Sequence, residues 1–286
     1  MMKKKIFTLV CAILIVAVFC GCSIAAVGGK SKLQQILDRG YLIAGTGSGN
    51  VPWHFVDETG ELVGFDIEMA RILADALFGD PSKVEFVEGS SDSRIPNLLT
   101  DKVDIVIQFM TITGARAQQV AFSIPYYTEG AGLLMPANGK YKNYDEMAEA
   151  VARGEKVVVS ALQNVYIDDY VQKLLPGAVC EQYESVALIY QAMDSGRADA
   201  TCTDASSAMW MAKTQPDKYK NTGVAAVPQG YGAAMRQDDQ IWINFVNTVF
   251  LDAMTGTTYE LYHNAYEKWF GEKLESPKMG RPSYYD

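Results

Sequence analysis

Histidine and cysteine are scarce in this sequence, which has 2 His and 5 Cys among 286 residues. His54 and His263 stand alone, without the close spacing that zinc-binding histidines show. A Gly-x-Ser-x-Gly turn, which would present a hydrolase nucleophile, is also missing. We therefore expect no metal ion, no cofactor and no catalytic residue.

Extremes of composition and an excess of positive charge are absent as well. Hydrophobic residues make up 49% of the chain and charged residues 21%, with 24 Gly and 10 Pro. These values exclude collagen-like, coiled-coil and disordered chains. The net charge is −9, and from residue 22 onward 22 basic side chains face 34 acidic ones, a charge of −12. An acidic surface of this size argues against nucleic acid as a partner.

Long apolar runs are limited to one, at the N-terminus. Three lysines at 3–5 precede an apolar run of 14 residues, Ile6 to Phe19, which fits the core of a signal peptide and is short of a bilayer span. The run ends in Phe-Cys-Gly-Cys, which resembles a bacterial lipobox. We therefore predict a lipoprotein signal peptide over 1–21, lipidation at Cys22 and a tether over 22–32. An ordinary cleaved signal or a short membrane anchor is the alternative.

Short β-like runs alternate with helical ones from Lys32 onward. The first block predicts strands over 41–44, 84–88 and 103–108, a hairpin over 54–63 and a helix with Asp66 as its N-cap. The second block predicts helices over 144–153, 165–175 and 185–195, strands over 156–160, 178–181 and 198–203, and a helix after Asp204. Two long helices, 239–255 and 257–270, follow. Two such blocks predict an α/β fold with two lobes, each a mainly parallel sheet flanked by helices.

Polar residues gather directly after several predicted strands. They are 45–50, 108–116, 160–164 and Asp204. Ligands of open α/β sheets bind at the carboxyl ends of the strands, so these segments are the candidate site. The glycine-rich run 45–50 is not a dinucleotide loop, because Asn50 takes the place of its last glycine and a hairpin follows instead of a helix.

Two arginines are predicted at the starts of helices, where the helix dipole disfavours a cation. Arg116 lies three residues after Thr113, a predicted N-cap, and Arg94 begins another helix. A bound anion would offset the dipole, because a guanidinium grips a carboxylate with two hydrogen bonds. The alternatives are a solvated surface side chain for Arg116 and a local pair with Asp92 for Arg94.

Asp204 is predicted to stand between a buried strand and a helix. It is either the N-cap of that helix or a carboxylate at the cleft that receives an ammonium group. Its position alone favours the cap.

Taken together, these residues resemble the bacterial extracellular solute-binding proteins, family 3, the amino-acid receptors of ABC importers. The resemblance extends from about Leu33 to Gly271. Its carriers, in order along the chain, are Pro52-Trp53, Gly64-Phe65-Asp66, Arg94-Ile95-Pro96, Asp104, Thr111-Ile112-Thr113, Arg116, Phe122-Ser123, Pro125-Tyr126-Tyr127, Ser195-Gly196-Arg197, Asp199, Asp204 and Tyr231-Gly232.

The resemblance implies a type II periplasmic-binding-protein fold, in which two crossing strands join lobes that close over a free amino acid. It implies one lobe over 33–128 and 238–275 and a second over 132–228. It further implies a monomer on the extracytoplasmic face of a bacterial membrane, anchored by lipid, that hands its ligand to an ABC permease. The polar, Pro-containing end of the sequence separately predicts a loose tail over 276–286.

The resemblance also implies roles for single residues. Arg116 matches the position that binds the ligand α-carboxylate, with the Thr111 hydroxyl beside it, and Asp204 matches the position that receives the α-ammonium. Trp53 belongs to the same expected ligand-binding set. Two positions depart from the family pattern. Phe109 replaces a small hydroxyl residue. The segment 160–164 replaces a Gly-Ser/Thr-Thr loop, and Gln163 or Asn164 would supply the hydrogen-bond donors of that loop.

The ligand side chain is expected to be acidic or polar. Relatives that bind basic or aromatic ligands place aromatic residues near Asn50 and Ser91, and the basic-ligand ones add an acid near Gly47; none of these is present. Arg94 matches the arginine that meets a side-chain carboxylate in acidic-amino-acid receptors. Distant negative charges are screened beyond about 8 Å, so Arg94 dominates locally. The sequence therefore favours glutamate or aspartate, then asparagine or glutamine.

Enzymes of the same fold are the alternative, notably a cyclohexadienyl dehydratase or a cell-wall transglycosylase. The first needs a cleft acid or base besides Asp204, and the second needs a further catalytic domain; the sequence shows neither. A sensory ectodomain, the third class, would carry a transmembrane helix after residue 286.

The two cysteines of the folded body, Cys180 and Cys202, are expected to be free thiols. The family strand order 2-1-3 in the second lobe would separate them by a central strand, roughly 9–10 Å from each other. A disulfide needs Cα atoms within about 7 Å.

Overall fold

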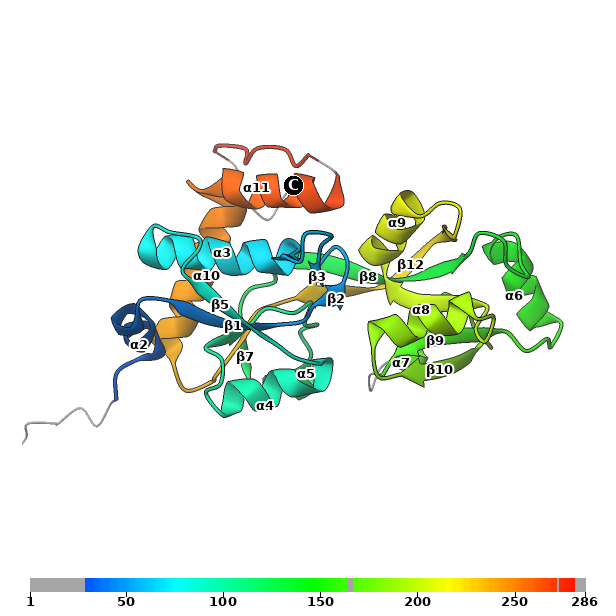
Figure 1. Ribbon diagram of the computed structural model, residues 1–286, viewed down its shortest axis with the longest axis horizontal. Coiled ribbons are helices and arrows are strands. Elements are labelled where there is room, and N and C mark those ends of the chain that lie inside the picture. Colours follow the sequence, from blue (N-terminus) through cyan, green and yellow to red (C-terminus); the bar gives the residue numbers. More distant parts are fainter. Residues whose placement is uncertain (1–28, 164–166, 272, 281–286) are drawn as a thin grey trace, which may run out of the picture. The chain divides into compact units, whose positions relative to one another are not determined.

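Figure 1 shows the computed structural model of the protein, which describes residues 29–163, 167–271 and 273–280. The chain from Lys32 onward forms one unit by its internal contacts. The predicted signal peptide and Cys22 lie outside the described residues. Among the helices that are described, none combines the length and hydrophobicity that crossing a bilayer requires.

The first lobe is built on a sheet with the strand order β5-β1-β6-β13-β7. Its strands are β1 (Leu42–Thr46), β5 (Val84–Glu88), β6 (Ile105–Val106), β7 (Ala121–Phe122) and β13 (Ala234–Met235). β1 pairs in parallel with β5 and β6, whereas β13 is antiparallel to β6 and β7. A small antiparallel sheet of β2 (Gly49–Asn50), β3 (His54–Val56) and β4 (Leu62–Val63) lies between β1 and the first long helix in sequence.

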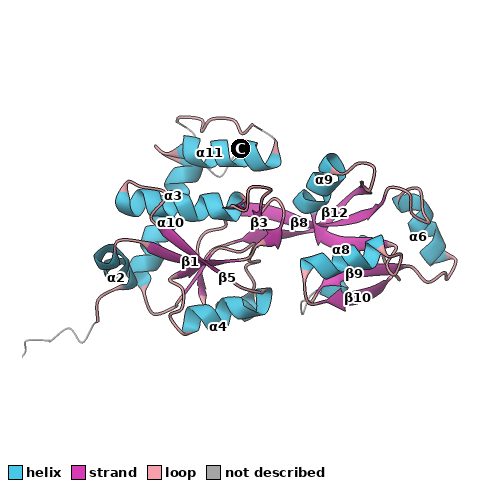
Figure 2. Ribbon diagram, viewed as in Figure 1, coloured by secondary structure: helices cyan, strands magenta, loops and turns pink. Residues whose placement is uncertain are grey.

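Helices cover both faces of this first sheet (Figure 2). Leu42 and Ala44 point into a core shared with α2 (Lys32–Arg39), α3 (Phe65–Phe78), α10 (Gln240–Thr255) and α11 (Tyr259–Phe270). Ile43, between them on β1, packs on the opposite face, against the cluster that contains Leu98 of α4 (Arg94–Leu99). The alternation follows from the two-residue period of a strand.

The second lobe is built on a sheet with the strand order β10-β9-β11-β8-β12. Its strands are β8 (Tyr127–Pro136), β9 (Val158–Leu162), β10 (Val179–Tyr183), β11 (Ala200–Asp204) and β12 (Tyr219–Tyr231). One core cluster joins the sheet to α6 (Tyr144–Ala152) and α7 (Ile167–Leu174), and others join it to α8 (Val186–Asp194) and α9 (Ala205–Thr214). β9, β10 and β11 are parallel to one another. At one side of the sheet, β8 is antiparallel to both of its neighbours, β11 and β12.

Two long strands carry the chain from the first sheet to the second and back, as Figure 1 shows. β8 and β12 pair antiparallel from Tyr127 opposite Tyr231 to Pro136 opposite Tyr219. At the first-lobe end, Tyr231 also forms a β-bridge with Thr111. These paired strands are the joint between the lobes.

The predicted α/β architecture with two sheets is confirmed, although both sheets are mixed: each has two parallel and two antiparallel strand pairings. The predicted strand over 84–88 matches β5, and the helix over 144–153 matches α6 to within one residue. The N-cap assignment of Asp66 is wrong: α3 begins at Phe65 with Gly64 at the N-cap position. Asp66 instead accepts hydrogen bonds from the Tyr126 hydroxyl and the Phe109 amide and contacts His54 Nδ1 at 2.8 Å.

Both cysteines of the folded body are free thiols. Cys180 pairs with Val159 across β10 and β9, and Cys202 pairs with Ala161 across β11 and β9. The central strand β9 therefore separates them, which confirms the strand order that the family resemblance implied.

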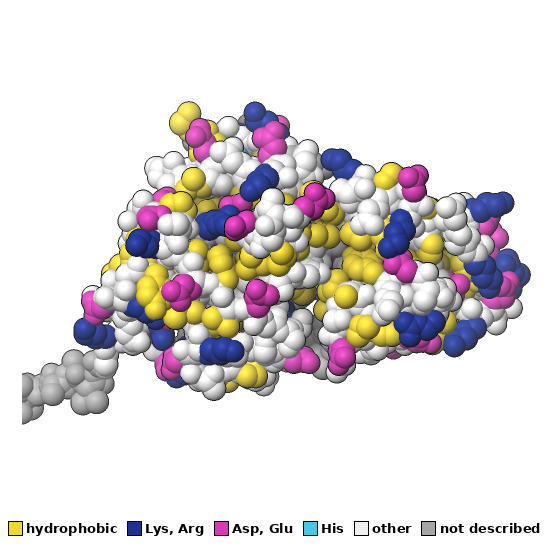
Figure 3. Space-filling model, in the orientation of Figure 1, with side chains coloured by type: hydrophobic (Ala, Val, Ile, Leu, Met, Phe, Trp, Pro, Cys, Tyr) yellow, Lys and Arg dark blue, Asp and Glu magenta, His cyan; other side chains and the backbone are white. Residues whose placement is uncertain are grey.

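The described surface shown in Figure 3 mixes charges of both signs. Acidic and basic side chains are interspersed over this face. Ion pairs of the described residues include Lys268 with Glu68 at 2.8 Å.

Candidate functional site

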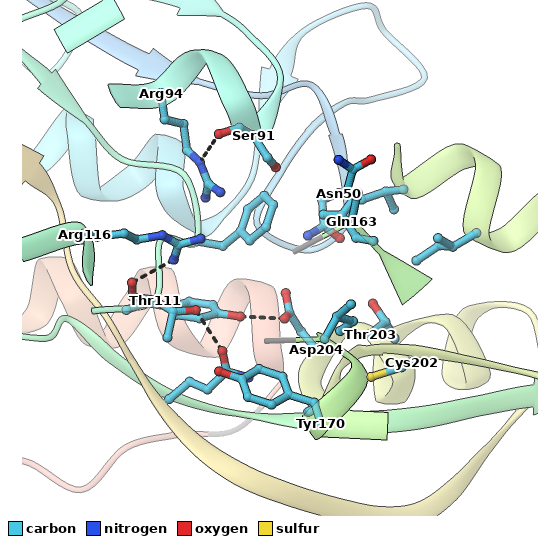
Figure 4. A pocket seen from close by; sticks show the side chains of 18 residues that line it. Asn50, Ser91, Arg94, Thr111, Arg116, Gln163, Tyr170, Cys202, Thr203 and Asp204 are labelled. Atoms are coloured by element: carbon cyan, nitrogen blue, oxygen red, sulfur yellow. Dashed lines mark hydrogen bonds between the residues drawn. The ribbon is translucent and has the colours of Figure 1, made fainter. Parts of the chain in front are cut away.

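One pocket is lined by residues that follow parallel strands of both sheets (Figure 4). The first lobe contributes residues after β1, β5 and β6, and the second contributes residues after β9 and at the end of β11. Seven residues were singled out from the sequence as ligand-binding, and six line this pocket: Arg94, Phe109, Thr111, Arg116, Gln163 and Asp204. The carboxyl ends of the strands are thus where the pocket lies.

Arg116 stands in the first turn of α5 (Gly114–Ala117). The Thr113 hydroxyl oxygen accepts the Arg116 amide hydrogen at 3.3 Å, which confirms Thr113 as the predicted N-cap. The guanidinium turns back and donates to the Thr111 carbonyl at 2.8 Å. The short helix therefore presents a partly buried cation at the pocket wall.

Arg94 is 8% exposed and lies at the start of α4. It donates to the main-chain carbonyls of Ser91 at 2.8 Å and Gln108 at 3.1 Å, and its guanidinium lies 5.5 Å from the centre of the Phe109 ring. Burial and the nearby Arg116 lower the pKa of Arg94 to about 10. Because both hydrogen bonds go to the main chain, the geometry does not favour the local pair with Asp92.

Asp204 ends β11 and stands at the N-cap position of α9. Within the described chain its carboxylate makes no capping hydrogen bond; it faces the pocket and accepts the Tyr231 hydroxyl at 2.5 Å. Burial, and then repulsion from Glu129, raise the pKa of Asp204 to about 8, although hydrogen bonds from Tyr231 and Asn50 act in the opposite direction. The carboxyl group is therefore ready to bind a cation that replaces its proton.

Thr111 and Phe109 form the wall between the two arginines and the joint. The Thr111 hydroxyl donates to Gln229 Oε1 on β12 at 2.8 Å. Phe109 has a φ of +36°, which is unusual for a residue with a side chain. Its amide donates to Asp66 at 2.9 Å and its ring stacks on His54 with centroids 4.7 Å apart. Phe109 thus offers the pocket an aromatic face at a position where the family pattern has a small hydroxyl residue.

Gln163 and Trp53 occupy contrasting positions. Gln163 follows β9, is exposed and lines the pocket. Its main-chain amide donates to the Tyr183 carbonyl at 2.7 Å. Its neighbour Asn164 lies outside the described residues. Trp53 does not line the pocket in the described structure: it is fully buried, 5.2 Å from the Tyr231 ring, and donates to Ser206 Oγ at 3.2 Å. Trp53 therefore contacts the pocket through the lining residue Tyr231, against which its ring packs.

Several lining residues were not assigned to the site from the sequence. Tyr231 and Gln229 come from the returning strand β12, and Tyr170 comes from α7. The Tyr231-Gly232 pair carried a family signal without a role. Nothing local in the sequence distinguishes Gln229 or Tyr170. Gln229 reaches the pocket through the pairing of β12 with β8, and Tyr170 reaches it through the packing of α7 on the second sheet. Asn50 and Ser91 also line the pocket. They stand near the positions where relatives that bind basic or aromatic ligands have aromatic residues.

The charges are divided between the lobes. The first lobe supplies the guanidinium groups of Arg94 and Arg116, and the second supplies the carboxyl group of Asp204. A small molecule with an anionic group and an ammonium group would meet opposite charges on both sides. Among the described residues, no group of His, Cys, Asp and Glu is arranged to hold a metal ion.

Known proteins are similar to this chain over most of its length. The profile of the bacterial extracellular solute-binding proteins, family 3, matches residues 42–272. The ABC transporter glutamine-binding protein GlnH of Bacillus subtilis (strain 168) is 27% identical over 282 residues, covering 94% of this chain and 98% of its own. A glutamine-binding protein of Geobacillus stearothermophilus is 31% identical over 208 residues, covering 72% and 77%.

A solved structure is similar in fold and sequence. The crystal structure of an ancestral amino-acid-binding protein, described as a precursor of cyclohexadienyl dehydratase, has a TM-score of 0.70 and 34% identity. The similarity covers 84% of this chain and 100% of that chain.

Proposed function

This chain belongs to the bacterial extracellular solute-binding proteins, family 3, and we propose that it binds a free polar amino acid. The preferred ligand is glutamate or aspartate, and asparagine or glutamine comes next. The observation that carries this proposal is the division of charge in one pocket, with Arg94 and Arg116 from the first lobe and Asp204 from the second.

The two ends of the ligand backbone would be held by different lobes. Arg116 would bind the α-carboxylate through its guanidinium, with the Thr111 hydroxyl beside it, and Asp204 would receive the α-ammonium. A zwitterion therefore gains its full binding energy only when both lobes reach it. That difference in affinity is what would shift the protein toward its closed form. The lobe boundaries at 33–128 with 238–275 and at 132–228 belong to this proposal.

The ligand side chain would meet Arg94. The Arg94 guanidinium is buried and packs over the Phe109 ring. It also lies close enough to Arg116 for the two positive charges to repel each other. A side-chain carboxylate would relieve this repulsion with charge-assisted hydrogen bonds, which are about twice as strong as neutral ones. The side-chain amide of asparagine or glutamine could accept hydrogen bonds from the same donors, but with a smaller gain in binding free energy. Two relatives are named for glutamine, which makes glutamine the strongest competitor to glutamate.

Delivery and location complete the proposal. The protein would carry its ligand to the membrane subunits of an ABC importer as a monomer. It would do so on the outer side of a bacterial membrane, held by lipid at Cys22 after removal of residues 1–21. Incorporation of labelled palmitate that is lost in Cys22→Ala tests the anchor.

A dehydratase is the second candidate, favoured by one observation. The solved relative at 34% identity is described as a precursor of cyclohexadienyl dehydratase, although it is itself an amino-acid-binding protein. Release of carbon dioxide and water from prephenate by the purified protein would support the enzyme. Absence of turnover together with tight amino-acid binding would support the receptor.

The deciding experiment is calorimetric titration of ligand-stripped protein with each of the twenty amino acids. We expect glutamate or aspartate to bind tightest, and lysine, arginine and histidine not to bind. Preferred binding of a cationic amino acid would contradict the role given to Arg94. Failure of all twenty would contradict the proposed function itself.

A further inference from the structure

Helix α9 begins beside the pocket, and the amide of its second residue, Ser206, is bonded to another element. Asp204 stands at the N-cap position without capping the helix in the described structure. Glu129 of β8 takes that role: it accepts the Ser206 amide at 3.3 Å and the Ser206 hydroxyl at 2.5 Å. It also accepts the amide of Gly130 at 2.8 Å, and the whole side chain is 5% exposed.

Asp204 can serve only one purpose at a time. An aspartate at an N-cap ordinarily folds back onto the second or third amide of its helix. In α9 the second amide, at Ser206, is already bonded to Glu129, and the Asp204 carboxylate instead faces the pocket and accepts the Tyr231 hydroxyl. We propose that Glu129 is a positioning residue that caps α9 in place of Asp204 and thereby holds the Asp204 carboxylate in the ligand pocket.

The backbone around Glu129 is shaped for this contact. Gly132 lies three residues along β8, and a Cβ there would stand 3.0 Å from the Cα of Ala205 in α9. A side chain at 132 would push the start of α9 away from β8. The glycine thus lets the helix come close enough for the Glu129 carboxylate to reach Ser206.

Ser206 is held from the first lobe as well. Trp53 donates its indole hydrogen to Ser206 Oγ at 3.2 Å, and the neighbouring Ser207 hydroxyl donates to the Val51 carbonyl at 2.7 Å. The start of α9 is therefore fixed between Glu129 of the joint and the segment after β2. Trp53, expected from the sequence to touch the ligand, contributes here through Ser206.

The arrangement has an electrostatic cost. Burial raises the pKa of Glu129, and its charge in turn helps to raise the pKa of Asp204. A neutral cap such as serine would satisfy the Ser206 amide without placing a second acid near Asp204. From the joint strand, the Glu129 side chain spans the distance to the start of α9.

The test distinguishes the capping hydrogen bond of Glu129 from its negative charge. It rests on the proposed function, because it uses an amino acid as the ligand. The variants are Glu129→Ala, which removes both, and Glu129→Gln, whose amide oxygen can still accept the Ser206 amide. Thr128→Ala, at an exposed neighbouring position of β8, is the matched control. For each, calorimetry compares the preferred amino acid with its des-amino analogue, which is glutarate if the ligand is glutamate.

We expect Glu129→Ala to weaken amino-acid binding by at least about tenfold and binding of the analogue by less than about twofold, because only the ammonium contact is lost. Glu129→Gln should stay within about threefold of the wild type for both. Equal weakening of both ligands by Glu129→Ala would overturn the proposal, as would a loss in Glu129→Gln as large as in Glu129→Ala.

A crystal structure of the ligand-free Glu129→Ala protein gives a readout that does not depend on the ligand. Asp204 should leave the Tyr231 hydroxyl and accept the Ser206 amide. An Asp204 that stays on Tyr231 would overturn the positioning role even if the amino-acid proposal holds. Conversely, a wild-type protein that binds no amino acid would contradict only the proposed function.

Discussion

Tyr231 donates its hydroxyl hydrogen to Asp204 at 2.5 Å, and this bond ties the end of the returning strand β12 to the end of β11. Tyr231 is 1% exposed, packs on Trp53 and forms a β-bridge with Thr111 of the first lobe. The carboxylate of the second lobe is thus oriented by a residue at the border of the first. The lobe closure proposed above would act on this contact, because Tyr231 lies on the strand pair that joins the lobes.

Tyr231→Phe should therefore weaken ligand binding without unfolding the protein. Loss of the hydroxyl removes a hydrogen bond to a charged group and raises the pKa of Asp204 further, so the affinity at pH 7 should fall by about three- to tenfold. Calorimetry measures the loss. Tyr219→Phe, which removes a hydroxyl bonded to Asp194, is the control and should bind normally. Equal affinities of the two variants would contradict this role.

Arg116→Ala should weaken binding of every amino-acid ligand by at least about 2 kcal/mol, because a charge pair with the α-carboxylate is lost in a partly buried site. Arg153→Ala, at an exposed end of α6, is the control. A ligand whose affinity survives Arg116→Ala would show that its α-carboxylate is held elsewhere. The measurement is titration calorimetry on variants whose melting temperatures match the wild type.

Arg94→Gln should change which ligand is preferred more than how tightly the best one binds. The variant keeps donors near Ser91 and Phe109 but loses the charge that would meet a side-chain carboxylate. We expect glutamate to lose at least about tenfold relative to glutamine. Competition between labelled glutamate and unlabelled glutamine measures the ratio directly. An unchanged ratio would show that Arg94 does not meet the ligand side chain.

Affinity should rise with pH between 6 and 8. The pKa of Asp204 is about 8 in the ligand-free protein, so below pH 8 binding of an ammonium group must first displace a proton. The ligand ammonium stays charged over this range, and the affinity should gain at least about tenfold from pH 6 to pH 8. Proton release appears as a dependence of the binding enthalpy on the buffer used. Asp204→Asn should bind weakly and show no such pH dependence.

Asp204→Asn should also stabilise the ligand-free protein at pH 8. Because the folded-state pKa of Asp204 lies above its unfolded value of 3.8, its stabilising contribution is greatest at low pH and is lost as the pH rises toward 8. An amide removes that loss, so the variant should exceed the wild type by more than about 1 kcal/mol at pH 8. Urea unfolding at pH 8 and pH 4 should show the difference shrinking at the lower pH. A variant less stable at both values would contradict the assignment.

Local patterns were enough to predict the elements and some of their ends. The alternation of strands and helices predicts both lobes, and Thr113 is the N-cap that its spacing to Arg116 indicates. These predictions succeed because the interactions involved span only a few residues along the chain. The strand order around Cys180 and Cys202 came from the family resemblance, and the pairing of β9 with both neighbours agrees with it.

The roles of Asp66 and Asp204 show where local patterns stop. Both precede helical sequence, and both were compatible with an N-cap. Asp66 lies inside its helix and bonds to Tyr126, 60 residues away in sequence. Asp204 is relieved of capping because Glu129 reaches Ser206 across a sequence separation of 77 residues.

The chain's amino-acid pattern alone thus established two α/β lobes with polar residues after their strands. Which carboxylate caps a helix and which faces the pocket was settled by the folded chain. The physical reason is competition for hydrogen-bond donors: an aspartate bonds to its own helix unless a distant group has already satisfied that amide.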